Sequence, residues 1–320
     1  MDKIIFKNKT KERIDKFLSR EFFSTGQLTR GEIIRQIKTG TVLVNNKKIK
    51  PSYILKEGDI ITQHVTRNTQ QNKITPNDKI ELDIIYQDEN IVVINKPAGI
   101  QIHPDHNEKE NTIVNALLAK FPEISAVGDN PKLRPGIVHR LDKDTSGILI
   151  IAKNQKTFLE LKKKFKNREI TKKYWAIVFG RLGDLGIIDK PLARAASYKK
   201  QVVAGRKTKT KIREAITEYK VLKEVADYSL VEVTPKTGRT HQIRVHMTSI
   251  GHPIVGDKTY KLKKYFTSYN IKRHLLHALS LEFSLRDKTY KFEAPLPPDF
   301  QKFLAKIENL DSLDSKAKKG

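Results

Sequence analysis

Cysteine is absent from the 320-residue chain. Its absence excludes disulfides, thiolate-bound metals and a cysteine nucleophile, and it fits the reducing cytoplasm. No run approaches the ~18 consecutive apolar residues of a membrane-spanning helix, and no secretory signal is visible. The chain also lacks a Walker loop, a G-x-G-x-x-G string and an H-E-x-x-H pairing, which are common signatures of nucleotide and metal sites. We therefore expect a cytoplasmic protein with no cofactor, no metal and no membrane contact.

Acidic residues are few. The chain has 36 Asp and Glu against 62 Lys and Arg, a formal net charge of +26. Of the basic residues 46 are Lys and 16 are Arg, a profile that a coding bias toward A and T produces as readily as selection for a polyanionic partner. Charge alone is therefore a weak indication of nucleic-acid binding. Apolar runs such as Ile91–Ile94 and Gly147–Ala152 still predict a folded core.

The first 65 residues have the pattern of a small α/β domain. They carry 14 Lys and Arg against 7 Asp and Glu, a net charge of +7. Thr29 is the expected N-cap of the second helix and Gly40 follows its last turn. The periodicity predicts helices at 13–18 and 30–38 and strands at 41–45 and 60–64. Several basic residues lie on these helices, including Arg13, Arg30 and Arg35, and are candidate RNA contacts.

Residues 66–79 are polar and patternless, which predicts a linker. Residues 80–306 alternate strands with fewer helices, and hairpin neighbours outnumber βαβ units. We therefore expect an α+β domain with a largely antiparallel mixed sheet, followed by a flexible tail at 307–320. Helices are expected at 112–120 and 155–166. Strands are expected at Ile91–Asn95, Gly136–His139, Ile148–Ala152, Tyr174–Phe179, Ala215–Leu222 and Ser229–Thr234.

A dense polar loop, His139 to Gly147, lies between two apolar segments. A carboxylate held rigidly in such a loop can act as a nucleophile or a general base. The pattern alone does not distinguish Asp142 from Asp144. The alternative is an ordinary polar turn whose Asp and Thr side chains bond the local backbone.

A second cluster follows Thr237. Thr240 is the expected N-cap and Gly251 the stop of a helix over 241–250. It would place Arg239 at the N-terminus and Arg244 in the first turns, where an arginine near a buried carboxylate would keep it ionised. The alternative is two surface arginines.

Two further features are ambiguous by pattern. Tyr174 alternates with Ala176 and Val178 on one strand face, which is more typical of a core residue. Residues 190–223 carry 11 Lys and Arg against 2 Asp and Glu, a net charge of +9. Lys207 and Lys209 lie there in a segment that is either a phosphate-contacting loop or a solvated run of charge.

Taken together, several strings resemble the RluA family of pseudouridine synthases over about residues 85–305. The central one is Gly136-Ile-Val-His-Arg-Leu-Asp-Lys-Asp-Thr-Ser-Gly147. The others, in the family's order, are Asn95-Lys-Pro-Ala-Gly99, Lys173-Tyr-Trp-Ala176, Gly238-Arg-Thr-His-Gln-Ile-Arg-Val-His246, His252-Pro-Ile-Val-Gly-Asp257 and Leu276-His-Ala278. Residues 12–65 resemble the alpha-L RNA-binding domain, and this order of domains is similar to the RluD branch, which acts on large-subunit ribosomal RNA.

The resemblance implies an enzyme that converts uridine in RNA to pseudouridine without metal or cofactor. It identifies Asp142 with the family's nucleophile and leaves Asp144 a loop-structuring role. Tyr174 matches the tyrosine that stacks on the base, and Arg244 matches the arginine that pairs with the nucleophile. Arg140 matches the base-extruding arginine, and His139 and Arg239 are expected to contact RNA beside it. We expect a monomer that acts on 23S ribosomal RNA.

Two other functions remain open from the sequence. One is a non-catalytic RNA-binding or ribosome-assembly protein with the same fold, and another is the same reaction on a different RNA such as tRNA. A glycoside hydrolase would need two opposed acids, whereas Asp142 and Asp144 lie two residues apart on one loop.

Overall fold

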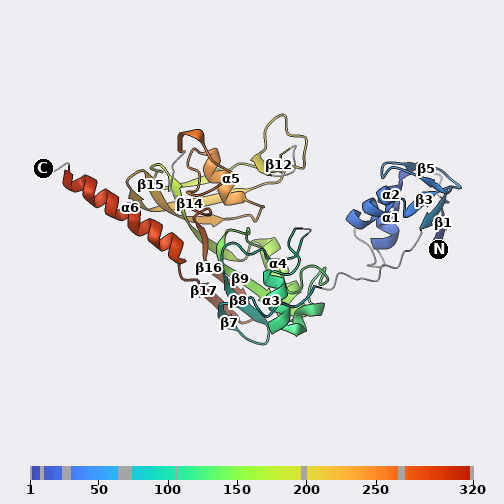
Figure 1. Ribbon diagram of the computed structural model, residues 1–320, viewed down its shortest axis with the longest axis horizontal. Helices are drawn as coiled ribbons and strands as arrows, with labels where there is room; N and C mark the ends of the chain where they lie inside the picture. Colours follow the sequence, from blue (N-terminus) through green and yellow to red (C-terminus); the bar gives the residue numbers. More distant parts are fainter. Residues whose placement is uncertain are drawn as a thin grey trace. The chain divides into compact units, whose positions relative to one another are not determined.

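The computed structural model describes residues 2–7, 11–23, 30–63, 74–105, 107–195, 200–265 and 271–317 (Figure 1). Its contacts divide the chain into two compact units, Met1–Asn72 and Lys73–Gly320. Of the linker predicted at 66–79, residues 66–73 lie outside the described residues, as does the predicted N-cap Thr29. Each unit has its own hydrophobic core and is described by itself.

The small unit combines two helices with a four-stranded antiparallel sheet. Ile14 of α1, Ile37 of α2, Val44 of β3 and Ile61 of β6 belong to its core, so both helices pack against the sheet through apolar residues. Its sheet has the order β1-β6-β3-β4, and β2 pairs with β5. The elements are β1 (Asp2–Ile5), β2 (Glu12–Arg13), α1 (Ile14–Phe23), α2 (Arg30–Thr39), β3 (Val42–Val44), β4 (Lys47–Lys48), β5 (Ile54–Leu55) and β6 (Ile60–Gln63).

The large unit is built on a nine-stranded sheet of order β11-β14-β15-β10-β16-β9-β8-β7, with β17 on β16. Among these strands only β16 and β9 run parallel, which confirms the predicted largely antiparallel mixed sheet. The strands are β7 (Ile84–Gln87), β8 (Ile91–Lys96), β9 (Ser146–Ala152), β10 (Thr171–Phe179), β11 (Leu185–Asp189), β14 (Ile216–Val225), β15 (Tyr228–Pro235), β16 (Leu276–Leu285) and β17 (Lys288–Glu293). Beside it, β12 (Leu192–Arg194) and β13 (Gln201–Val203) form a separate hairpin.

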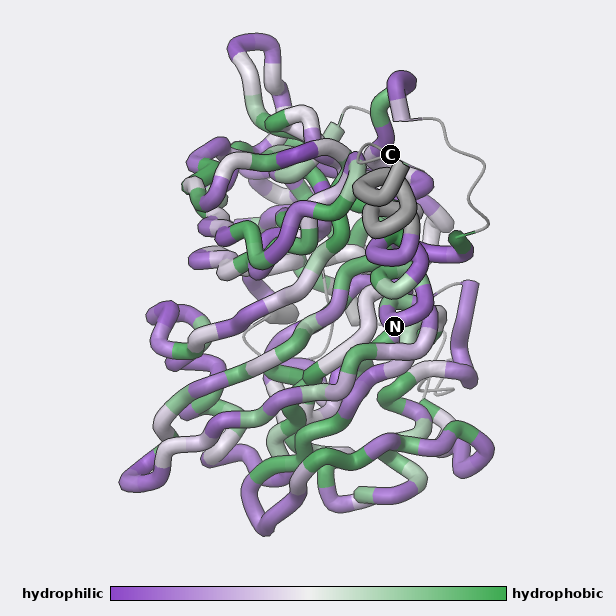
Figure 2. Tube along the Cα trace, turned by 90° about the vertical axis from the view of Figure 1, so that its left-hand side faces the viewer, coloured by the Kyte–Doolittle hydropathy of each residue, from purple (hydrophilic) through white to green (hydrophobic). Residues whose placement is uncertain are grey.

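Helices cover both faces of this sheet. Alternate residues of β9 divide between two cores: Ile148 and Ile150 pack in the cluster that holds Phe158 of α4, whereas Leu149 and Ile151 pack in the cluster that holds Leu117 of α3. Burial on both faces explains why β9 is a continuous apolar run instead of an alternating one. Figure 2 shows hydrophobic residues along the strands and hydrophilic residues in the turns. The helices are α3 (Ile113–Lys120), α4 (Gln155–Asn167), α5 (Gln242–Ser249) and α6 (Pro298–Ala317), with short 3-10 turns η1 (Pro122–Ala126) and η2 (Lys263–Tyr265).

The beginning of β9 lies directly against β16, and Gly147 makes this approach possible. Gly147 has a φ of +109°, and a Cβ there would lie 2.2 Å from the carbonyl oxygen of Ala278. Only glycine fits such a backbone and such a contact. The polar loop that precedes β9 is thereby fixed at the centre of the sheet.

Two local predictions are wrong. Gly136–His139 is no strand: Gly136 has a φ of +69° and the segment makes a single bridge, Ile137 to Ile151. The N-cap of α5 is His241, not Thr240. Of the tail predicted at 307–320, residues 307–317 continue α6, and Ile307 is buried in the core that α6 shares with the sheet. No helix in the described residues is long and apolar enough to cross a membrane.

Candidate active site

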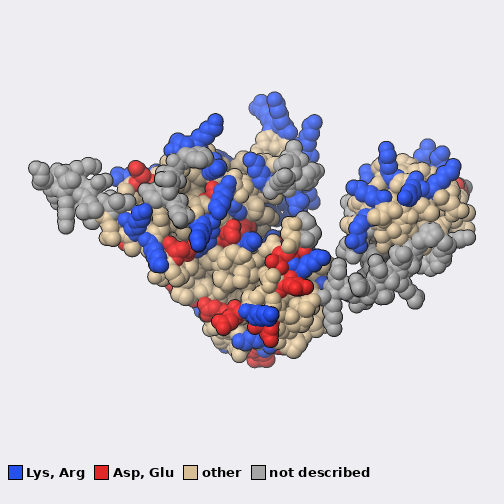
Figure 3. Space-filling model, viewed as in Figure 1, with Lys and Arg blue, Asp and Glu red and all other residues tan. Residues whose placement is uncertain are grey.

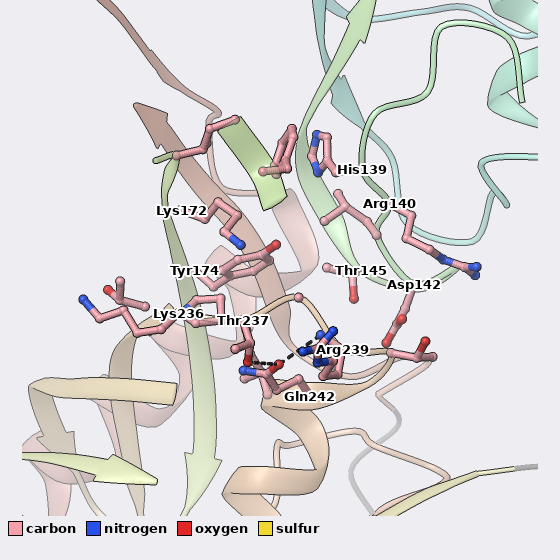
Figure 4. A pocket seen from close by; sticks show the side chains of 18 of the residues that line it. His139, Arg140, Asp142, Thr145, Lys172, Tyr174, Lys236, Thr237, Arg239 and Gln242 are labelled. Atoms are coloured by element: carbon pink, nitrogen blue, oxygen red, sulfur yellow. Dashed lines mark hydrogen bonds between the residues drawn. The ribbon is translucent and has the colours of Figure 1, made fainter. Parts of the chain in front are cut away.

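A cavity of about 600 Å³ lies over the sheet of the large unit (Figure 4). It is lined by the polar loop before β9, by the end of α4, by β10 and by the connection from β15 to α5. Among the predicted site residues it collects His139, Arg140, Asp142, Tyr174, Arg239 and Arg244. Figure 4 shows Asp142 and Tyr174 on opposite sides of the cavity.

The polar loop is anchored through its backbone, so that Asp142 can face the cavity. Buried Thr145 donates its amide to the Asp142 carbonyl at 3.1 Å, and its hydroxyl bonds His274 at 2.8 Å. The ammonium of Lys96, which is fully buried, donates to the carbonyl of Lys143 at 3.0 Å and to two further carbonyls. Burial lowers the pKa of Lys96 to about 7. The loop is therefore held in place by Lys96 and His274, neither of which was predicted as a site residue.

Arg244 of α5 connects two carboxylates. Its Nη1 donates to Asp142 Oδ2 at 3.0 Å. Its Nε and Nη2 donate to the two oxygens of Asp257 at 2.7 and 3.0 Å. Burial alone would raise the pKa of Asp257, but the hydrogen bonds and charge of Arg244 outweigh it and lower that pKa. A buried bidentate pair thus fixes the guanidinium that contacts Asp142.

His241 lines the cavity beside Asp142 and is bonded to the buried Tyr260. His241 Nε2 lies 3.9 Å from Asp142 Oδ1, and His241 Nδ1 bonds the Tyr260 hydroxyl at 2.8 Å. The guanidinium carbon of Arg244 lies 5.1 Å from the centre of the Tyr260 ring, within the range of a cation–π contact. Burial lowers the pKa of His241 although the charge of Asp142 opposes it, so the ring is neutral at pH 7.

Tyr174 and Lys172 face the cavity from β10. Burial and the charge of Asp142 raise the pKa of Tyr174, so its side chain is a neutral phenol. Tyr174 also packs at the edge of two hydrophobic clusters. It is therefore both a core residue, as the strand pattern predicted, and a residue of the cavity wall. Burial lowers the pKa of Lys172, and Figure 4 shows its ammonium near the Tyr174 ring.

His139 and Arg140 differ in how freely they could contact RNA. His139 Nε2 accepts the amide of Ile150 at 3.0 Å, and its ring stacks on Phe165 with centroids 4.8 Å apart. Burial lowers the pKa of His139 to about 3. It therefore ties the loop to β9 and lines the cavity as a neutral ring. Arg140 is exposed at the edge of the cavity.

The remaining predicted contacts lie outside the centre of the cavity. Arg239 lines its rim and donates to the Glu214 carbonyl at 2.9 Å. Lys207 and Lys209 are exposed in the segment after β13 and do not line it. Figure 3 shows Lys and Arg gathered over this segment above β12.

In the small unit, the three predicted contacts are the arginines of β2 and α2. Arg13 donates to the buried Asp15 at 2.9 and 3.1 Å. Arg35 is exposed on α2, whereas the side chain of Arg30 lies outside the described residues.

The arrangement suits general acid–base or nucleophilic chemistry by one carboxylate. The described residues contain no group of three His, Asp or Glu side chains arranged to hold a metal ion. Sequence reasoning missed Lys96, His241, Asp257 and Tyr260 as site residues. Three of the four lie within the strings quoted for the family resemblance, which was the available signal.

The comparisons with known proteins agree with this geometry. Residues 90–249 match the family model for RNA pseudouridylate synthase, and residues 12–61 match the S4 domain. The chain is 37% identical over 302 residues to the uncharacterized RNA pseudouridine synthase YlyB of Bacillus subtilis (strain 168), covering 93% of this chain and 94% of that protein. It is 35% identical over 311 residues to ribosomal large subunit pseudouridine synthase D of Borreliella burgdorferi, covering 94% and 91%.

A solved structure with the same fold is that of human RNA Pseudouridylate Synthase Domain Containing 1. It superposes with a TM-score of 0.58 at 26% sequence identity, covering 70% of this chain and 88% of that chain. Together with the family model and the curated relatives, this match confirms the resemblance drawn from the sequence. The chain belongs to the RNA pseudouridylate synthase family and is an RNA pseudouridine synthase with an N-terminal S4 RNA-binding domain.

Proposed function

We propose that this enzyme isomerises specific uridines of large-subunit (23S) ribosomal RNA, with Asp142 as its nucleophile. The observation that carries the proposal is the contact between Asp142 Oδ2 and Arg244 at 3.0 Å, across the cavity from Tyr174. The arginine keeps the carboxylate ionised and oriented, and the phenol supplies a flat face for a base. Asp142, Arg244 and Tyr174 are also the three residues that match the family's nucleophile, its arginine partner and its base-stacking tyrosine.

In the proposed reaction the target uridine leaves its stack and enters the cavity. Arg140, exposed at the rim, occupies the gap it leaves in the RNA. The base stacks on Tyr174 while Asp142 promotes cleavage of the bond from N1 to C1′, either by attack on C1′ or by assisting glycal formation. The uracil then turns, C5 bonds C1′, and the proton lost from C5 is balanced by one gained at N1. Because the uracil stays in the cavity, no cofactor is required.

The choice of RNA rests on the domain order and on the relatives. Several relatives are named ribosomal large subunit pseudouridine synthase D, including those of Borreliella burgdorferi and Xylella fastidiosa. The S4 domain provides a second RNA-binding module, with exposed Arg35 on α2 and Arg13 on β2 as candidate contacts. RNA is then recognised by loop shape and extruded bases. We place the enzyme in the cytoplasm as a monomer.

The test replaces Asp142 and maps the product. Asp142→Asn is expected to abolish pseudouridine while the Kd for ribosomal RNA changes by less than about twofold, because the amide keeps the shape and removes the nucleophile. Product is read by carbodiimide-dependent reverse-transcription stops on RNA from a strain lacking the gene, after treatment with purified enzyme.

Each outcome decides a separate point. Turnover by Asp142→Asn at the wild-type rate contradicts the role of Asp142. Stops restored in tRNA and not in 23S RNA would replace the proposed substrate. Tight binding by the wild type without any new stop favours the alternative of a non-catalytic RNA-binding or ribosome-assembly protein.

A further inference from the structure

His241 occupies a strained position at the beginning of α5. Its φ of 55° and ψ of 17° lie in the left-handed region, and its side chain makes no capping hydrogen bond to the helix. A residue other than glycine keeps such a conformation only where the surroundings fix it, and such residues cluster at functional sites. The imidazole turns away from the helix terminus and toward Tyr260 and Asp142.

The hydrogen bonds of Tyr260 determine which ring nitrogen of His241 carries the proton. The backbone amide of Gln201 donates to the Tyr260 oxygen at 2.9 Å, which favours the arrangement in which the hydroxyl donates its own proton to its second partner. Within the described residues the Tyr260 hydroxyl has His241 Nδ1 as this partner, at 2.8 Å. A neutral imidazole that accepts at Nδ1 carries its proton on Nε2. The strand β13 therefore sets the tautomer of a ring that lines the cavity.

The Nε2–H group points to the side of Asp142 that Arg244 leaves free. Arg244 holds Oδ2, and Nε2 lies 3.9 Å from Oδ1. That separation is too long for a direct hydrogen bond. It leaves one donor, Nε2–H, and one acceptor, Oδ1, close enough for a single hydroxyl to bond both. A ribose 2′-hydroxyl can accept and donate at the same time.

We propose that His241 Nε2–H and Asp142 Oδ1 together bind the 2′-hydroxyl of the target nucleotide. The proposal rests on the proposed function, which brings C1′ of that nucleotide to Asp142. The 2′-oxygen is attached to the carbon next to C1′, so this contact fixes the reacting carbon beside Oδ1. It would also allow the site to distinguish RNA from DNA at the modified position. His241 is then a substrate-recognition residue, and Tyr260 is a positioning residue that acts through it.

The experiment is a cycle between one enzyme variant and one substrate change. Wild type and His241→Gly are compared at saturating RNA in single turnover on an oligonucleotide with uridine or 2′-deoxyuridine at the mapped target. Glycine tolerates the left-handed backbone, so the variant removes the ring without new strain. Each single change is expected to slow the reaction about 10-fold to 100-fold, the range for one lost hydrogen bond with an unpaired partner. The double change is expected to cost no more than either alone.

Further variants separate recognition from folding. Tyr260→Phe is expected to slow the ribose substrate more than the deoxyribose substrate, because only the former uses the oriented Nε2–H. The Kd for the uridine oligonucleotide is expected to stay within about threefold of the wild type for both variants. Independent, multiplicative losses from His241→Gly and 2′-deoxyuridine would overturn the proposal. If the wild type forms no pseudouridine on the uridine oligonucleotide, the proposed function fails instead, so the two failures are distinguishable.

Discussion

At the scale of single residues, the site depends on how Arg244 is held. Two of its nitrogens bind Asp257, and only Nη1 reaches Asp142. Asp257 in turn accepts the amides of Thr259 and Tyr260 at 2.8 and 2.9 Å. Ile254 forms a bridge with Val178 of β10, and the turn that follows it fixes the carboxylate of Asp257. This carboxylate does not line the cavity. Asp257 is a positioning residue for the guanidinium.

Asp257→Asn tests this role. The amide can accept from one guanidinium nitrogen but cannot balance its charge, so Arg244 is expected to shift away from Asp142. We expect the single-turnover rate to fall about 100-fold, as small misplacements at reacting groups do, while the Kd for RNA changes little. The control is Asp129→Asn, the same substitution at an exposed ion pair with Lys162 that does not line the cavity, and it is expected to leave the rate unchanged. A wild-type rate for Asp257→Asn would contradict the positioning role.

The residues that sequence reasoning could identify are those that we propose to carry the reaction. Asp142 and Arg244 lie 102 positions apart, and their contact was expected only through the family resemblance. Asp257 and Tyr260 were missed because a side chain that orients another leaves no periodic or charge signal. Tyr174 shows the reverse problem, since a residue that is both core and cavity wall follows the pattern of a core strand.

At the scale of elements, regular segments were predictable and irregular ones were not. The strands β8, β9, β10 and β15 and the helices α3, α4 and α5 lie where periodicity placed them, within one to three residues at each end. Gly136–His139 was misassigned because its composition is that of an apolar strand. Its bonds to β9 are instead one backbone bond, from the Ala152 amide to the Gly136 carbonyl, and one side-chain bond, from the Ile150 amide to the His139 ring. The polar composition of 307–320 gave no indication that its first residue, Ile307, packs in a hydrophobic core.

The segment after β13 allows a prediction at this scale. Lys207 and Lys209 are exposed in a run that also contains Arg206 and Lys211. If both lysines contact phosphates, Lys207→Gln with Lys209→Gln should weaken RNA binding and lower the slope of log Kd against log salt by about 1.4, or ~0.7 for each phosphate. The rate at saturating RNA should be retained. The matched control, Lys220→Gln with Lys223→Gln on β14, removes the same charge, and an equal change of slope there would show a solvated charge run.

At the scale of the whole molecule, the net charge of +26 has a meaning only through its placement. Basic side chains gather on the small unit and over the segment above β12 (Figure 3), whereas Arg244 in the cavity wall lies between two aspartates. The contribution of exposed lysines to RNA affinity is weakened by salt, whereas the interactions of buried charged groups are screened much less. The large unit also buries several histidines, which makes its stability depend on pH.

His139, His274 and His277 are held neutral in the folded state. Burial lowers the pKa of His139 to about 3 and those of His274 and His277 to about 4, below the unfolded value of about 6.5. The unfolded chain therefore takes up protons below pH 6.5 that the folded chain takes up only near pH 4. Stability is full above pH 6.5 and falls from there to pH 4, by about 3 kcal/mol for each of the buried rings of His274 and His277.

Urea unfolding between pH 7.5 and 4 measures this loss. Trp175 of β10 is the single tryptophan, so its fluorescence reports on the large unit alone. His277→Gln is the matched variant, because an amide can still bond Ser146 and the Ala294 carbonyl, the partners of His277 at 2.9 and 3.3 Å, and does not titrate. Its free energy of unfolding should fall less between pH 6.5 and 4 than that of the wild type. The lowered pKa values of Asp257 and Asp299 place their protonation below this window, so an unchanged slope in His277→Gln would contradict the assignment of the acid loss to buried histidines.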